Sequence, residues 1–78
     1  MSVLEELGLP PLPEALPRPV IDNHTHLFST AEYSGLPVEE SLRLAAQVNV
    51  TRVVEVGCDV ADARSAVDLA SRNPQVRA

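Results

Sequence analysis

The sequence has little of what usually stabilises a very small secreted domain. It contains one cysteine, Cys58, among 78 residues, so an internal disulfide is excluded, and no cysteine–histidine cluster has the spacing of a structural zinc site. A chain of this length forms at most one small domain with a modest hydrophobic core. The cysteine content favours a reducing compartment.

Long apolar runs and a basic leader are also absent. No run approaches the ~20 apolar residues that a membrane-spanning helix needs. Residues 1–18 lack the basic start and apolar centre of a signal peptide and carry Glu5 and Glu6 instead. We therefore expect a soluble, cytoplasmic protein with no membrane partner.

Positive charge is scarce. The six basic residues are all arginine and are scattered, against 11 acidic residues and a net charge of −5. Binding to nucleic acid without regard to sequence depends on clusters of basic side chains. This segment alone is therefore not expected to bind a phosphate backbone in that way, and the sequence indicates no protein partner.

Proline divides the chain into two regions. Five of the seven prolines lie between Pro10 and Pro19, which favours extended backbone over a helix or a sheet. We assign residues 1–18 to a proline-rich arm, with a possible helical turn within residues 2–7. Such an arm can dock at the amino ends of the strands or remain disordered.

From residue 19 onward, β-branched segments alternate with amphipathic ones, and Gly, Asn and Pro mark the boundaries. The pattern predicts strands over 19–23 and 51–56, helices over 38–48 and 60–72, a loop over 29–35, and a third strand starting at residue 75. This alternation is typical of an α/β fold with parallel strands and right-handed crossovers. Two or three strands cannot cover both faces of such a sheet, so we expect the N-terminal part of a larger protein, with both helices on one side.

Both histidines lie in the run Val20-Ile-Asp-Asn-His-Thr-His-Leu-Phe28. In a strand, Asp22, His24 and His26 point to one face. Neutral imidazoles with a carboxylate suit first-row metal ions, and active sites of parallel α/β folds assemble at the carboxyl ends of strands. The sequence therefore predicts a metal site, the alternative being two structural histidines with local hydrogen bonds.

The run Asp22-Asn23-His24-Thr25-His26-Leu27 resembles the first-strand signature of the metal-dependent hydrolase superfamily, most closely the TatD-related deoxyribonucleases. The segment VTRVVEVGCD resembles that family's second strand, and ADARSAVDLASRNPQVRA the helix and third strand that follow. The resemblance covers residues 20–78. It implies that residues 19–78 are the first two β/α units of a (β/α)₈ TIM barrel that hydrolyses phosphodiester bonds in DNA with Mg, Mn or Zn, two ions per complete site.

The resemblance also assigns residues. His24 and His26 match the family's first-strand metal ligands, whereas the other ligands come from later strands, so we expect these 78 residues alone to be inactive. The catalytic residues stay unknown. Phe28 stands where many relatives have an acidic residue, and no role transfers to it.

Four further expectations concern neighbouring side chains. Asp22 is expected to orient an imidazole or to pack in a polar layer of the barrel rather than to bind metal. Cys58 is expected to be a small buried apolar residue rather than a ligand or nucleophile. Asp59 is expected to cap the following helix. Glu55 can point into the barrel or away from it, and the sequence leaves both open.

Two other functions stay open. The same pair of histidines serves barrels of the amidohydrolase type that act on an amide or a cyclic ester. A non-catalytic small α/β module with structural histidines is the other alternative. Ligands on later strands, or metal binding itself, would separate these possibilities.

Overall fold

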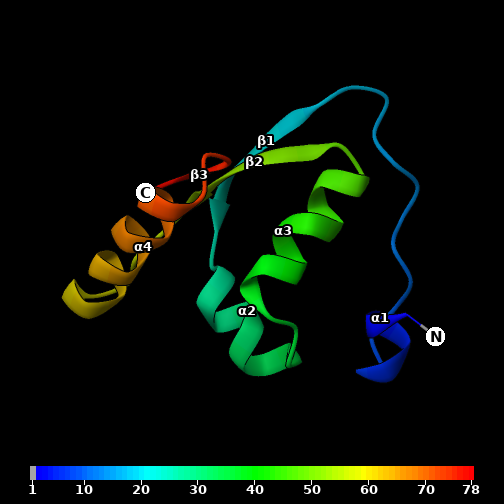
Figure 1. Cartoon of the computed structure of the whole chain (residues 1–78), viewed down its shortest axis with the longest axis horizontal. Helices are drawn as coiled ribbons and strands as arrows, with labels where there is room; N and C mark the ends of the chain where they lie inside the picture. The colour runs from blue at the N-terminus through cyan, green and yellow to red at the C-terminus, as the bar shows by residue number, and fades with distance from the viewer. Residues whose placement is uncertain (1) are drawn as a thin grey trace.

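The computed structural model describes residues 2–78, which form three strands and four helices. In chain order these are α1 (Val3–Glu6), β1 (Val20–Thr25), α2 (Leu27–Ser34), α3 (Val38–Gln47), β2 (Val50–Glu55), α4 (Val60–Arg72) and β3 (Val76–Arg77). The strands make one sheet in the order β1-β2-β3 (Figure 1), and both neighbouring pairs are parallel. The predicted parallel α/β arrangement is thus confirmed for this chain.

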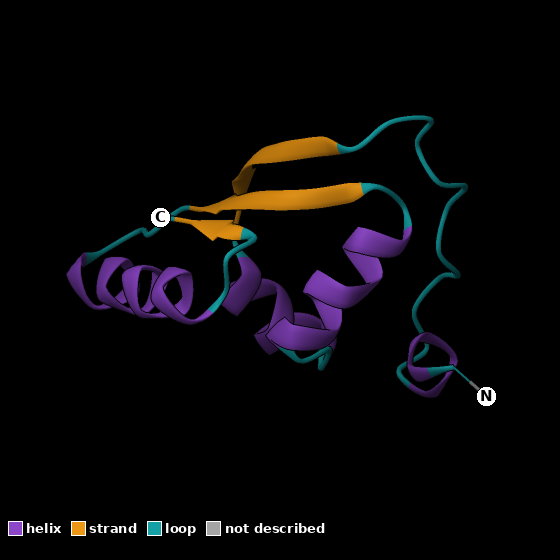
Figure 2. Ribbon diagram, turned by 45° about the horizontal axis from the view of Figure 1, so that its top comes forward, coloured by secondary structure: helices purple, strands orange, loops and turns teal. Residues whose placement is uncertain are grey.

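The helices cover one face of the sheet. Figure 2 shows α3 and α4 beneath the strands, on the same side, as the sequence predicts. Their apolar faces pack with the strands and the start of α2 in a single core, whose buried residues are Leu27, Leu42, Val53, Leu69 and Val76. Leu69 and Val76 have at most 1% of their surface exposed, so the core is centred on the second half of the chain.

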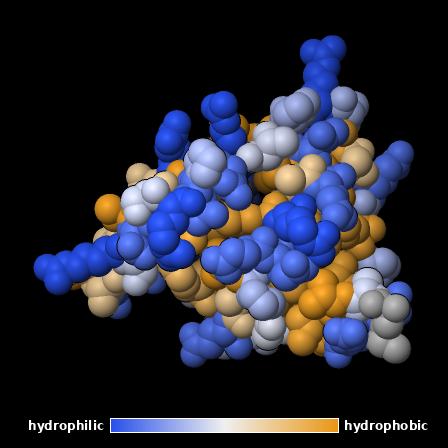
Figure 3. Space-filling view, in the orientation of Figure 1, coloured by the Kyte–Doolittle hydropathy of each residue, from blue (hydrophilic) through white to orange (hydrophobic). Residues whose placement is uncertain are grey.

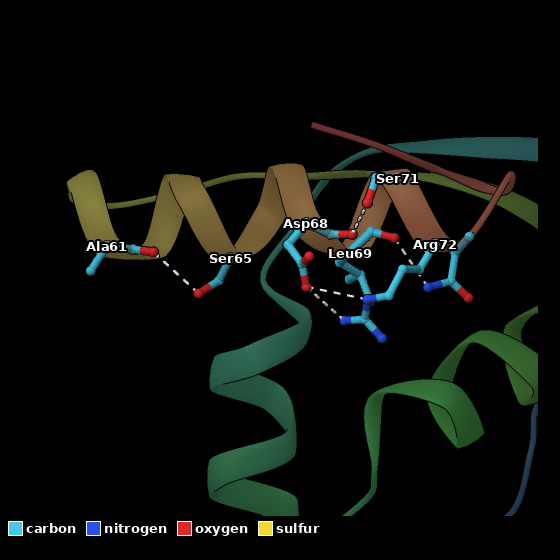
Figure 4. Close-up of polar contacts among 7 residues, drawn as sticks. Ala61, Ser65, Asp68, Leu69, Ser71 and Arg72 are labelled. Carbon is cyan, nitrogen blue, oxygen red and sulfur yellow. Dashed lines mark hydrogen bonds and ion pairs between the residues drawn. The ribbon is translucent and has the colours of Figure 1, made fainter.

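Helix α4 begins and ends where the sequence predicts. The Asp59 carboxylate accepts the N–H of Asp62 at 2.8 Å, which confirms it as the N-cap. On the solvent side of the helix, Asp68 pairs with Arg72 at 3.1 Å (Figure 4). Asn73 ends the helix and donates its side-chain N–H to the carbonyl of Leu69.

Helix α2 corrects the sequence prediction, which placed a loop over residues 29–35. The helix begins at Leu27, which is buried, and the neighbouring Phe28 packs against the same core. It ends at Gly35, whose φ of 76° is left-handed and whose N–H reaches the carbonyl of Ala31. The prediction was wrong because tertiary packing of Leu27 and Phe28 outweighs the weak helix propensity of the Ser and Thr residues.

The proline-rich arm returns to the amino end of the sheet. The N–H of Leu16 donates to the carbonyl of Val48 at 3.0 Å, and the Asn49 side chain donates to the carbonyl of Leu16. Asn49 has a left-handed φ of 70° and joins α3 to β2. The end of the arm is therefore anchored opposite the carboxyl end of the strands, where the histidines lie.

Strand β1 is open to solvent. Residues 20–24 are all exposed, and Ile21 has 57% of its surface accessible. Figure 3 shows apolar side chains (orange) reaching the surface among polar ones. Parallel sheets are normally covered on both faces, whereas Figure 2 shows helices over only one face of this sheet within residues 2–78. Among these residues, none of the helices is long and apolar enough to cross a membrane.

Candidate metal centre

The two histidines lie together at the carboxyl end of β1. His24 is within the strand, and His26 follows its last residue and occupies the N-cap position of α2. Their ring centres are 5.1 Å apart and their planes make an angle of 73°. The end of β1 and the turn into α2 therefore bring both imidazoles to one place, at the end of the sheet where parallel α/β folds assemble their sites.

The separation of the rings fits two ligands of one ion. A ligating nitrogen lies ~2.0–2.1 Å from a zinc ion and ~1.1 Å from its own ring centre, so tetrahedral ligation puts two ring centres ~5 Å apart. The observed 5.1 Å matches this value. An edge-to-face pair of rings without an ion has similar spacing, and a metal titration distinguishes the two arrangements.

The imidazole of His26 is held by the end of β2. Its Nδ1 lies 3.1 Å from the carbonyl oxygen of Val56. Because a carbonyl oxygen only accepts, this contact favours the neutral tautomer that has its proton on Nδ1 and its lone pair on Nε2. A hydrogen bond from the second ring nitrogen to a carbonyl is the usual support of a metal-binding histidine.

Cys58 lies beside the same ring nitrogen and corrects the prediction of a buried side chain. Its Sγ is 3.9 Å from Nδ1 of His26, and the residue is exposed. It lies in the turn after β2 and directly precedes Asp59, the N-cap of α4. Its N–H donates to the Asp62 carboxylate at 3.0 Å, so the backbone at this turn is fixed by the start of α4.

Asp22 acts on the backbone of β1. Its carboxylate accepts the main-chain N–H of His24 at 3.1 Å. The expected contact with an imidazole is not among the hydrogen bonds of the described residues. The exposed carboxylate therefore shapes the strand two residues before the first histidine, where the pairing with β2 is irregular between Asp22 and Thr25.

The sequence left open the direction in which the Glu55 side chain points, and the structure shows its partner. Glu55 is the last residue of β2 and has only 4% of its surface exposed. Its two carboxylate oxygens lie 2.8 and 3.1 Å from the N–H of Leu27. The only sequence signal was an acidic residue at the end of a β-branched strand that also carries Arg52, which does not say toward which neighbour Glu55 points.

The ligand set within this chain is incomplete. In the part of the chain that the structure describes, no group of three or more His, Cys, Asp or Glu side chains is placed to hold a metal ion. A site built here has two imidazoles and must take its other ligands from water or from other segments. Comparison of the chain with protein-family models, with curated proteins and with solved structures finds no match.

Proposed function

We propose that this chain supplies the first two β/α units of a (β/α)₈ barrel whose divalent-metal site hydrolyses phosphodiester bonds in DNA. The observation that carries the proposal is the pair of imidazoles at the carboxyl end of β1, with ring centres 5.1 Å apart. The assignment of DNA as substrate rests on the resemblance of residues 20–78 to TatD-related deoxyribonucleases.

The open face of the sheet supports a larger fold. β1 is an edge strand with exposed apolar residues, and β3 is the other edge. A barrel buries the open face of its sheet in its interior and removes both edges by closure. Further strands beside β1 and β3 would give this sheet the cover that it lacks within residues 2–78.

The histidines have distinct supports in the proposed site. The carbonyl of Val56 keeps the proton of His26 on Nδ1 and so leaves Nε2 available to bind a metal ion. Asp22 fixes the backbone at His24. A divalent ion bound by these imidazoles lowers the pKa of coordinated water and polarises a phosphoryl oxygen.

The test of the catalytic proposal is hydrolysis of single- and double-stranded DNA by the full-length barrel, with added Mg²⁺, Mn²⁺ or Zn²⁺. We expect His24→Ala and His26→Ala each to abolish metal-dependent cleavage while circular dichroism stays close to that of the wild type. Cleavage at wild-type rates in both variants contradicts the proposal. Hydrolysis of amides or cyclic esters in place of DNA would favour the amidohydrolase alternative, and absence of metal binding would favour the non-catalytic module.

A further inference from the structure

The start of α2 has an unusual N-cap. Helices expose N–H groups at their first turn, and Ser, Thr, Asp or Asn normally accepts one of them from the N-cap position. Here His26 takes that position, and its side chain makes no capping hydrogen bond. The imidazole turns instead to the carbonyl of Val56, so the helix needs an acceptor from elsewhere.

Glu55 supplies that acceptor from the neighbouring strand. Both of its oxygens face the N–H of Leu27, the first residue of α2, at 2.8 and 3.1 Å. Within residues 2–78, it is the only buried charged or polar residue. Burying a carboxylate is costly unless it is compensated, and the positive end of a helix together with a main-chain N–H provides such compensation.

Residues at the end of β2 and just after it hydrogen-bond to three consecutive residues around His26, namely 25–27. The N–H of Val56 donates to the carbonyl of Thr25 at 2.9 Å, and the carbonyl of Val56 accepts from the ring of His26 at 3.1 Å. The Glu55 carboxylate takes the N–H of Leu27. Glu55, the last residue of β2, and Val56, which follows it, thus fix the backbone on both sides of His26 and also its ring.

We propose that Glu55 is a positioning residue for His26: by capping α2 from β2, it frees the imidazole to donate Nδ1–H to Val56 and to offer Nε2 to a metal ion. The inference rests on the proposed metal-binding function. Without the carboxylate, the Leu27 N–H loses its acceptor, and the side chain that ordinarily accepts N–H groups at the start of a helix is that of the N-cap residue, here His26. To accept, its ring must give up the Val56 contact and move its proton to Nε2, the nitrogen that the metal needs.

The decisive experiment reads the tautomer of His26 in the metal-free 78-residue chain. Long-range ¹H–¹⁵N spectra at about pH 8, above the ordinary pKa of histidine, show which ring nitrogen carries the proton. We expect the Nδ1–H form in the wild type and in Glu55→Gln, which keeps an acceptor oxygen, and loss of that preference in Glu55→Leu. Asp68→Asn, which removes an exposed carboxylate of α4, is the matched control and should leave His26 unchanged.

A zinc titration of the same variants separates this inference from the proposed function. Glu55→Leu should weaken binding about 10–100-fold, the usual effect of losing a group that supports a metal ligand, and Glu55→Gln should stay close to the wild type. Zinc binding absent from the wild type, with the expected tautomers, would refute the metal site and leave the positioning role standing. Nε2–H in the wild type, an unchanged tautomer in Glu55→Leu, or loss of the Nδ1–H form in a folded Glu55→Gln overturns the positioning role.

Discussion

Gly57 separates β2 from the turn that carries Cys58, and we predict that Gly57→Ala destabilises the chain strongly. A Cβ at this position would lie 2.7 Å from both the Cα and the main-chain N of Ala63, and 3.0 Å from its Cβ. Backbone atoms in the first turn of α4 cannot move aside without shifting the helix. Such overpacking costs ~1–3 kcal/mol, and in a domain of this size ~2 kcal/mol lowers the melting temperature by about 8–16 °C.

Thermal unfolding followed by circular dichroism measures the effect, and two variants isolate its cause. Gly8→Ala is the control, because Gly8 has a left-handed φ of 70° but nothing within 4 Å of the place that a methyl group would take, so it carries only the backbone cost of ~1–2 kcal/mol. Adding Ala63→Gly to Gly57→Ala should give no rescue, since the two shortest contacts are to main-chain atoms. An unchanged melting temperature in Gly57→Ala, or its recovery in the double variant, refutes this reasoning.

Three further predictions concern stability. Asp59→Ala removes the acceptor of the Asp62 N–H and should lower the free energy of unfolding in urea by ~1 kcal/mol. Asp59→Asn, which can still accept this N–H, should keep most of that stability, and equal losses in both variants would contradict a capping role. Leu69→Ala, at a side chain 1% exposed, should cost ~2–5 kcal/mol, whereas Val67→Ala, 62% exposed, should change stability by less than ~0.5 kcal/mol; similar effects would show that the core is elsewhere. The hydrogen bond from Arg43 lowers the pKa of Glu40, so Arg43→Ala should raise that pKa toward its ordinary value in a ¹³C NMR titration. The pKa of Glu40 is lower in the folded chain than in the unfolded one, so its pairing with Arg43 stabilises the fold at pH values above the unfolded pKa. That stabilisation is lost as the pH falls through the folded pKa. A Glu40 pKa that does not change in Arg43→Ala would refute the hydrogen bond between the two side chains.

The succession of α3, β2 and α4 could be predicted from the sequence. The β-branched run before Gly57 and the apolar stripes ending at Gln47 and Arg72 each carry a local periodic signal, and their observed bounds differ from the predicted ones by about one residue. Asp59 and Asn73 mark the limits of α4 by side-chain chemistry that acts within a few residues. These features depend on neighbours in the sequence, so a local pattern is sufficient to find them.

The features that the sequence did not predict depend on contacts across the fold. Helix α2 is stabilised by packing of Leu27 and Phe28 against residues from other elements. The Glu55 cap joins residues 28 positions apart, and the residues next to Cys58 in the sequence do not show that it is exposed. For the candidate site, the expectation that His24 and His26 lie together came from strand alternation, whereas the position of His26 after the end of β1 and its hydrogen bond to Val56 required the structure.

The central claim is that His24 and His26 bind one metal ion, and a calorimetric titration of the 78-residue chain with Zn²⁺ tests it most directly. We predict one ion per chain, bound no more tightly than micromolar because two imidazoles are an incomplete ligand set. Binding should be lost in both His24→Ala and His26→Ala and retained in Cys58→Ser. Zinc binding of wild-type strength in either histidine variant, or no detectable binding by the wild type, would contradict the account.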